Sequence, residues 1–304
     1  MTLTPSLRLA AALMVTGFVV AGCEAPSAPA DAPLAATPAS PDVSPFRIGA
    51  LQAWSLKDGD IVLPVASTDF PWADGPAVQA ALTAGGQPTD QIRLSIQPLL
   101  IKDGERLVLI DTGAGGAMGT EGKLVASLRA AGFQPAQVTD ILISHAHGDH
   151  LGGLLDKGGA LTFPNAVVRM SPPEWAFAQQ GAEDAGAGPL LAAIAPKVQA
   201  FSPGAQVTPS IRAVPLPGHT PGHSGYQITS GDSRLLYIGD ALHSPVISVA
   251  RPDLVNAWDS DSPAAVGTRR LLTANDQPVY AAHFPFPGRG RFQPQGDGFV
   301  WVAE

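Results

Sequence analysis

The chain has 304 residues and a formal net charge of −8, and it is 45% hydrophobic but only 14% charged. This length is enough for one large domain or two modest ones with a sizeable core. No run of lysines or arginines occurs along it, so the sequence lacks the cationic footprint that a nucleic-acid partner requires. Its 33 glycines and 30 prolines favour many short strands and turns, which predicts a β-rich α/β protein.

The first 23 residues have the pattern of a bacterial export signal. Arg8 precedes an apolar run from Leu9 to Val20, which has the length of a signal-peptide core and is too short to span a bilayer as a helix. Val20-Ala21-Gly22-Cys23 resembles a lipobox, whose cysteine is lipidated and becomes the first mature residue. An ordinary signal cleaved slightly downstream is the alternative. Both interpretations predict an exported protein, periplasmic or at the cell surface, and a lipidated Cys23 would be its only membrane contact.

Residues 24–45 are rich in Ala, Pro, Ser and Asp and have almost no large apolar side chain. This composition predicts a linker, with a packed irregular segment as the alternative. The folded domain is expected to cover residues 46–304. Because Cys23 is the single cysteine, no intrachain disulfide and no thiolate ligand is available to that domain.

The first half of the domain is predicted to alternate short strands with short helices. The strands are expected at residues 46–51, 60–65, 93–101, 106–110 and 138–143, with a hairpin about Asp103-Gly104. The helices are expected at residues 76–84 and 122–131, the second ending at Gly132.

The strand at 138–143 leads into Ser144-His145-Ala146-His147-Gly148-Asp149-His150, where four of seven residues are types that bind metals. Any one of these histidines alone could be an ordinary core or surface residue. Together they crowd more polar groups into one turn than fold stability requires, since buried polar groups need partners. Imidazole nitrogen and carboxylate oxygen suit zinc and related divalent ions, so the segment predicts a metal site.

The second half is predicted to hold strands at residues 166–170, 211–216, 224–229, 234–238 and 279–282, the last being the final strand of the domain. A helix should begin at Ser171-Pro172-Pro173-Glu174, with Ser171 as its N-cap and Glu174 at its third position. Residues 181–188 are expected to form a flexible insert. Further helices are expected at residues 190–198 and 262–274.

Three further ligand types follow predicted strands or occupy tight turns. His219 lies in the Gly- and Pro-rich turn 217–223, Asp240 follows the strand at 234–238, and His283 follows the strand at 279–282. Ligands at the ends of core strands are held by rigid elements, as a metal site requires.

The order His145-X-His147-X-Asp149-His150, then His219, Asp240 and His283, resembles the metallo-β-lactamase fold superfamily. Asp111-Thr112-Gly113 is similar to the turn that precedes this motif in the family, and the likeness covers about residue 46 to the C-terminus. It implies an αββα four-layer sandwich with a dinuclear site at one edge of its two sheets. By the same resemblance, the first metal would be held by His145, His147 and His219, the second by Asp149, His150 and His283, and Asp240 would bridge them.

Two segments resemble the methyl parathion hydrolase and lactonase-like branch: residues 239–243 and 282–288. The bridging Asp240 differs from class B β-lactamases, which lack that bridge. The small N-acyl-homoserine lactonases carry a tyrosine where this chain has His243.

The implied cofactors are two divalent ions, with zinc first and manganese, cobalt or iron as alternatives. Such a pair would share a hydroxide as the nucleophile and polarise the carbonyl or phosphoryl oxygen of a small ester, lactone or phosphotriester. Asp149 would accept or relay a proton beside the bridging Asp240. His243 would either hydrogen-bond the substrate or leaving group, or stabilise its own loop. The alternatives are a thioester hydrolase of the glyoxalase II type and a non-catalytic lipoprotein that binds a metal or ligand.

Several other residues have two interpretations. His223 is either structural or a ligand, and Asp111 is expected to support the site from its turn. Trp258 and Asp259 are interpreted as the entry to the last helix. Five aromatic residues could line an apolar pocket or pack in the core: Phe70, Trp72, Trp175, Phe284 and Phe286. Nothing in the sequence specifies the oligomeric state.

Overall fold

The computed structural model of the chain describes residues 1–2, 40–181 and 187–304. The predicted signal peptide with Cys23, most of the predicted linker and most of the predicted insert at 181–188 lie outside the described residues. The first strand begins at Val43, so residues 43–45 belong to the sheet and not to the linker. Within the described ranges, no helix has the length and apolar character needed to cross a membrane.

Two large sheets form the framework, with strand orders β1-β2-β5-β6-β7-β8-β9 and β10-β11-β12-β13-β14-β15. The first contains β1 (Val43–Ile48), β2 (Leu51–Leu56), β5 (Leu99–Asp103), β6 (Arg106–Ile110), β7 (Asp140–Leu142), β8 (Val167–Met170) and β9 (Val198–Ala200). The second contains β10 (Ile211–Pro215), β11 (Ser224–Ser230), β12 (Ser233–Tyr237), β13 (Val279–Tyr280), β14 (Arg289–Gln295) and β15 (Gly298–Ala303). A separate hairpin pairs β3 (Gly59–Pro64) with β4 (Gln91–Ile96).

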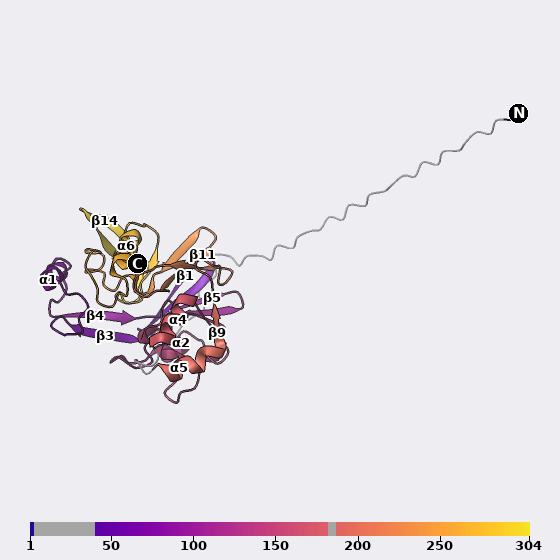
Figure 1. Cartoon of the computed structure of the whole chain (residues 1–304), viewed down its shortest axis with the longest axis horizontal. Coiled ribbons are helices and arrows are strands. Elements are labelled where there is room, and N and C mark those ends of the chain that lie inside the picture. Colours follow the sequence, from indigo (N-terminus) through magenta and orange to yellow (C-terminus); the bar gives the residue numbers. More distant parts are fainter. Residues whose placement is uncertain (3–39, 182–186) are drawn as a thin grey trace.

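The helices are short. They are α1 (Gly75–Ala84), α2 (Leu124–Ala130), α3 (Gly148–Leu151), α4 (Pro172–Gly181), α5 (Gly188–Ile194) and α6 (Ser262–Thr273). In Figure 1, α2, α4 and α5 group on one side of the sheets, and α6 lies beside β14 on the other.

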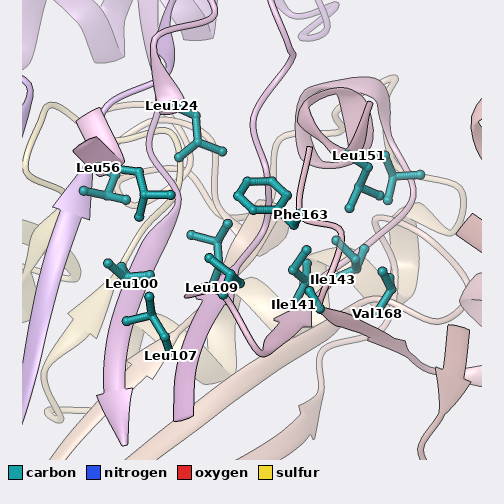
Figure 2. Packing of buried hydrophobic residues seen from close by; sticks show 14 of the residues in the cluster. Leu56, Leu100, Leu107, Leu109, Leu124, Ile141, Ile143, Leu151, Phe163 and Val168 are labelled. Atoms are coloured by element: carbon teal, nitrogen blue, oxygen red, sulfur yellow. The ribbon is translucent and has the colours of Figure 1, made fainter. Parts of the chain in front are cut away.

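Alternating side chains of the central strands divide the core into layers. On β6, Leu107 and Leu109 pack toward α2 and α5, whereas Val108 and Ile110 pack against the second sheet. Successive strand residues point to opposite faces, so a continuous apolar run buries both faces of a sheet. The cluster between the first sheet and its helices is shown in Figure 2, where Leu100, Leu109 and Ile141 lie side by side. A third cluster joins the outer face of the second sheet to Leu272 of α6. The predicted αββα sandwich is confirmed.

Four predicted elements differ from the structure. The expected strand 46–51 crosses the turn at Gly49, where φ is positive, and β2 after that turn was not predicted. The expected strand 93–101 breaks at Gln97-Pro98, because Pro98 has no N–H to continue a ladder. Its halves separate, with β4 pairing with β3 and β5 pairing with β2 and β6.

The expected helix 190–198 ends earlier, and β9 begins at Val198. The strand at 279–282 is not the last, because β14 and β15 follow as an antiparallel pair. The sequence of β14, Arg-Gly-Arg-Phe-Gln-Pro-Gln, lacks the apolar alternation that predicts a strand. Its position beside β13 is decided by tertiary pairing.

The β3–β4 hairpin and α1 build a smaller unit with its own core. Val78 and Leu82 of α1 pack with Leu94 of β4 and with Trp72 and Ile247 from neighbouring loops. In Figure 1 this unit extends to one side of the sandwich. It supplies one wall of the candidate site described next.

Candidate metal centre

The ligand-type residues meet at one end of the sandwich. β7 leads into the loop carrying His145 and His147 and into α3 with Asp149 and His150. Asp240 lies in a short 3₁₀ turn (Gly239–Ala241) that closely follows β12. His283 follows β13, and β12 and β13 are parallel neighbours. The carboxyl ends of parallel strands meet at one edge, so residues distant in sequence converge there.

Three histidines form the first half of the cluster. His147 Nδ1 lies 3.1 Å from His145 Nε2 and 3.0 Å from His219 Nε2. The three nitrogens therefore face a common point. This half matches the set that the sequence assigns to the first metal.

His150, His283 and Asp149 form the second half. The Nε2 atoms of His150 and His283 lie 3.6 Å and 3.5 Å from Asp149 Oδ2. His283 Nε2 lies 3.1 Å from Asp240 Oδ2, and Asp240 lies between the two halves with its carboxylate toward both. Its Oδ2 is 3.6 Å from His145 Nε2 and 3.5 Å from His219 Nε2. Its Oδ1 is 3.1 Å from His150 Nε2 and 3.0 Å from His283 Nε2. The structure thus places all seven predicted ligands in one cluster, in which six are buried and His147 is half-buried.

The donor set fits metal ions. His150 Nε2 and Asp240 Oδ1 are buried and make no hydrogen bond with any residue that the structure describes. Leaving buried polar atoms without a partner is costly, so such groups normally find one. Nitrogen and oxygen donors that converge from several rigid elements are satisfied by a divalent cation between them.

The electrostatics of the histidines differ between the two halves. Burial holds the pKa of His145 well below its ordinary value, and burial with the neighbouring His219 lowers the pKa of His147 to about 4. These rings are therefore neutral at pH 7, the form that binds metals. Burial also opposes charge on His150, but the carboxylates of Asp240, Asp149 and Asp111 outweigh it and raise the pKa of His150. The second half is the more anionic of the two and favours a cation.

A cavity of about 320 Å³ opens onto the cluster. His147, Asp149, His219, Asp240 and His283 form its polar floor. Its walls are apolar and come from Ile61 and Leu63 of β3, Leu94 of β4, Met118 and Trp258. The β3–β4 hairpin therefore shapes the space above the ligands.

Comparison with known proteins decides the family. The model of the metallo-beta-lactamase superfamily matches residues 93–283, which is more than half of the chain and contains every residue of the cluster. The chain belongs to the metallo-beta-lactamase superfamily.

Sequence similarity extends to proteins that are named as hydrolases. The chain is 27% identical to the probable metallo-hydrolase Rv2300c of Mycobacterium tuberculosis over 212 residues, which cover 57% of this chain and 65% of that protein. The chain thus spans somewhat less than two thirds of that relative.

Two solved structures are similar over more of their length. AidC, a dizinc quorum-quenching lactonase in complex with a product, N-hexanoyl-L-homoserine, superposes with a TM-score of 0.79 at 30% identity, over 86% of this chain and 97% of AidC. The hydrolase AbOPH superposes with a TM-score of 0.77 at 29% identity, over 86% of this chain and 97% of AbOPH.

Asp111 supports the metallo-beta-lactamase-type cluster from behind. Its Oδ1 accepts a hydrogen bond from Ser144 N at 2.7 Å, and its Oδ2 accepts from Tyr237 Oη at 2.7 Å and lies 2.8 Å from His150 Nδ1. The bond to Nδ1 directs His150 Nε2 toward the cluster. Asp111 has a φ of 60°, an uncommon conformation for a residue with a side chain. The sequence predicts this supporting role, and the geometry agrees with it.

Glu174 is a supporting residue that sequence reasoning assigned only to the start of a helix. It is fully buried, with 0% exposure, and its carboxylate joins two ligand loops. Oε1 accepts from Ala146 N at 2.7 Å, while Oε2 accepts from Thr220 Oγ1 at 2.7 Å and from Gly222 N at 3.0 Å. Ala146 lies between two ligands and Thr220 follows a third. The capping role of Ser171 holds, since Ser171 Oγ accepts from Glu174 N.

Asp259 is more than part of a helix entry. Its Oδ1 lies 3.2 Å from His219 Nδ1, and its Oδ2 accepts from Arg269 Nη1 at 2.7 Å. The pair orients His219 so that Nε2 faces the cluster. His283 is oriented in the same way through Nδ1, which lies 2.8 Å from Ser95 O. Contacts of this kind fix ring orientation and tautomer in metal sites.

His223 takes the structural role among its two interpretations. Its Nε2 accepts from the backbone N of Asp240 at 3.0 Å, and its Nδ1 donates to Leu216 O at 3.1 Å. Gly239 has a φ of 49°, and a side chain there would lie 2.7 Å from His223 Nε2. Residue 239 is therefore glycine so that the turn can present Asp240.

His243 lies beside Asp240 and His219, and the ligand atoms of these three residues lie within 4.8 Å of one another. It is 1% exposed, and its Nε2 lies 3.2 Å from Asp240 Oδ2. It does not line the described cavity, so its predicted role in catalysis stays a prediction. None of the five predicted pocket aromatics lines this cavity either. Trp258, interpreted from sequence as part of a helix entry, does so instead.

Proposed function

We propose that this chain is a dinuclear metal-dependent hydrolase that opens small lactones. The observation that supports this most directly is the position of Asp240. Its Oδ2 faces His145 and His219 of one ligand set, its Oδ1 faces His150 of the other, and His283 Nε2 lies within 3.1 Å of both oxygens. A carboxylate shared in this way by two ligand sets is the arrangement of a bridged pair of ions.

Each set of residues would hold one ion, with zinc as the first candidate and manganese, cobalt or iron as alternatives. Two such ions, when bound, supply Lewis-acid activation of a water and of the substrate's carbonyl oxygen. His145, His147 and His219 would hold the first, and Asp149, His150 and His283 the second. Asp149 also lines the cavity, where its carboxylate would accept a proton and pass it to the leaving oxygen.

The cavity favours an uncharged substrate with an apolar arm. Its polar groups are confined to the ligand floor, and Ile61, Leu63, Leu94 and Trp258 offer apolar contact above it. Ligand pockets typically combine apolar walls with a few placed polar groups. The similarity to AidC supports a lactone with an acyl chain. Esters and phosphotriesters could also place an electrophilic carbon or phosphorus atom beside the ligand residues at the floor of the cavity. They therefore serve as comparison substrates.

The test is hydrolysis by the purified full chain loaded with zinc. We expect an N-acyl homoserine lactone to be cleaved faster than an aryl ester or an aryl phosphotriester. Asp240→Asn should lower this activity, whereas its matched control Glu105→Gln, which changes an exposed carboxylate, should behave as wild type. Tight binding of two zinc ions without turnover of any of the three substrates would instead support a non-catalytic metal-binding protein.

We also propose that the chain is exported and anchored through Cys23. The support is the order Arg8, apolar run, then Val20-Ala21-Gly22-Cys23. Wild type expressed in a bacterium should fractionate with membranes, and Cys23→Ser should leave soluble or unprocessed protein. Equal membrane association of both proteins would contradict lipidation at Cys23.

A further inference from the structure

A second cavity lies at the end of the sandwich remote from the metal centre. Its volume is about 560 Å³, and residues at the end of β1 and the beginnings of β12 and β14 line it. β12 starts at this cavity and leads at its other end to Asp240. The length of the strands therefore separates the two cavities, so this one is not part of the hydrolase site.

Four arginines line this cavity: Arg47, Arg234, Arg289 and Arg291. The chain as a whole carries a net charge of −8 and only 18 basic residues, so such a concentration is contrary to its overall charge. Two acidic residues, Asp232 and Glu304, also line it. The arginines outnumber the acidic side chains, and the cavity is locally cationic.

The acidic residues do not satisfy all of these arginines. Arg291 is occupied, since its Nε donates to Glu304 Oε1 at 2.8 Å and its Nη1 donates to Asp276 O at 2.8 Å. Arg234 is exposed and makes no ion pair or side-chain hydrogen bond with any residue in the described part of the chain. Glu304, one of the two acidic side chains that line the cavity, is thus already paired with Arg291.

Arg289 gives the strongest indication of a missing partner. Its guanidinium makes no hydrogen bond or ion pair with any described residue, and because protein atoms cover Nε, an anion would be held by the two terminal NH₂ groups. Its guanidinium lies over the ring of Phe46, 4.3 Å from the centroid. Stacking on Phe46 fixes the plane of the guanidinium and leaves its N–H groups directed along its edge. Burial lowers the pKa of Arg289, as expected for a cation without a bound anion.

We infer that this cavity binds a small organic anion through a carboxylate or phosphate group. Guanidinium groups offer paired N–H donors that match the oxygens of both groups, and an anion would satisfy Arg289 and Arg234 together. The volume of about 560 Å³ accommodates a small metabolite and not merely a bare ion.

Isothermal titration calorimetry on the zinc-loaded full chain tests this inference, with inorganic phosphate and succinate as probes. We expect at least one of them to bind this site, and binding to weaken as sodium chloride is added. Arg234→Gln should weaken that binding at least about tenfold, because it removes a charge-assisted hydrogen bond from an exposed position where folding is not at risk. Arg289→Gln should act in the same direction.

Arg129→Gln is the matched control. Arg129 is an exposed residue on α2, outside the cavity, and the substitution changes the net charge by the same amount. It should bind the probe as wild type does, and both Arg234→Gln and Arg129→Gln should keep the wild-type hydrolytic rate. Unchanged affinity in Arg234→Gln would place the anion elsewhere, for example at the metal centre, and would overturn the inference. Absence of binding by both probes would overturn it as well.

Discussion

Replacing Glu174 with glutamine should weaken both the fold and metal binding, although the side chain keeps its size. The two carboxylate oxygens accept three hydrogen bonds, from Ala146 N, Thr220 Oγ1 and Gly222 N. A glutamine has one carbonyl oxygen, so its NH₂ group must face at least one of these donors. If the oxygen stays near Thr220 and Gly222, the NH₂ group meets the Ala146 N–H, and in the other orientation two donors lose their acceptor.

The magnitude follows from the better orientation. One buried donor without an acceptor costs about 1–3 kcal/mol, so we expect the free energy of unfolding to fall by about this amount. Ala146 lies between His145 and His147, so the loop that carries both ligands should also loosen. Loss of an outer partner of this kind typically lowers metal affinity by about 10–100-fold.

Urea unfolding of the full chain and competition for zinc against a chelator measure the two effects. Glu105→Gln, at an exposed position, is the control and should change stability by less than about 0.5 kcal/mol. Thr220→Val removes a different hydrogen bond to the same carboxylate, so the loss in the double variant with Glu174→Gln should depart from the sum of the two single losses. Wild-type stability in Glu174→Gln would refute the argument from buried hydrogen bonds. Reduced stability with unchanged zinc affinity would refute the coupling to the ligand loops.

Three other predictions follow from the same structure. Asp240→Ala should lower both the zinc content, measured by atomic absorption, and the rate of lactone hydrolysis. Full activity in a variant that has lost one zinc ion would contradict the proposal that both ligand sets share the Asp240 carboxylate. Leu109→Ala should lower the free energy of unfolding by about 2–5 kcal/mol in urea denaturation, since Leu109 is fully buried in the cluster under α2, and a loss below about 1 kcal/mol would contradict that packing. Asp140→Asn should destabilise the chain at pH 7, because Arg106 and Arg169 lie 2.8 Å and 3.1 Å from the Asp140 carboxylate. Burial raises the pKa of Asp140, but its hydrogen bonds outweigh burial and lower that pKa. The ionised form is therefore favoured on folding, and its stabilisation is complete above the unfolded pKa of about 3.9 and lost as the pH falls through the lower folded pKa. Urea unfolding should show a smaller difference in the free energy of unfolding between wild type and Asp140→Asn at about pH 3.5 than at pH 7. An equal difference at both pH values would contradict a stabilising role of the ion pairs.

The predicted parts of the fold are those with a strong local pattern. β6 has the bounds that its apolar run indicates, and α6 begins beside its N-cap at Asp261, whose side chain accepts from Ala264 N. β2 was not predicted because the turn at Gly49 was not recognised, and β14 was not predicted because its composition is polar. β2 is held by pairing with β5, which lies far from it in sequence, and β14 is held by pairing with β13 across the loop 281–288.

For the site, the sequence by itself determined which side chains could bind metal. Four of the seven lie within the stretch 144–150, and His219, Asp240 and His283 each follow a recognisable strand or turn. Residue type and short spacing are local properties, so the sequence alone is enough to recognise them. The same holds for the order of the ligands, which identified the family.

Only the tertiary structure decided which residues support and surround those ligands. Glu174 contacts residues 28 and 46 positions away, and Asp259 meets His219 across 40 positions. The cavity walls come from β3 and β4, whose pairing depends on the break at Pro98. Contacts over such separations leave no periodic trace, because they depend on how the two sheets pack. The same packing brings Arg289 over Phe46 at the far end of the sandwich, where no local motif marks a site.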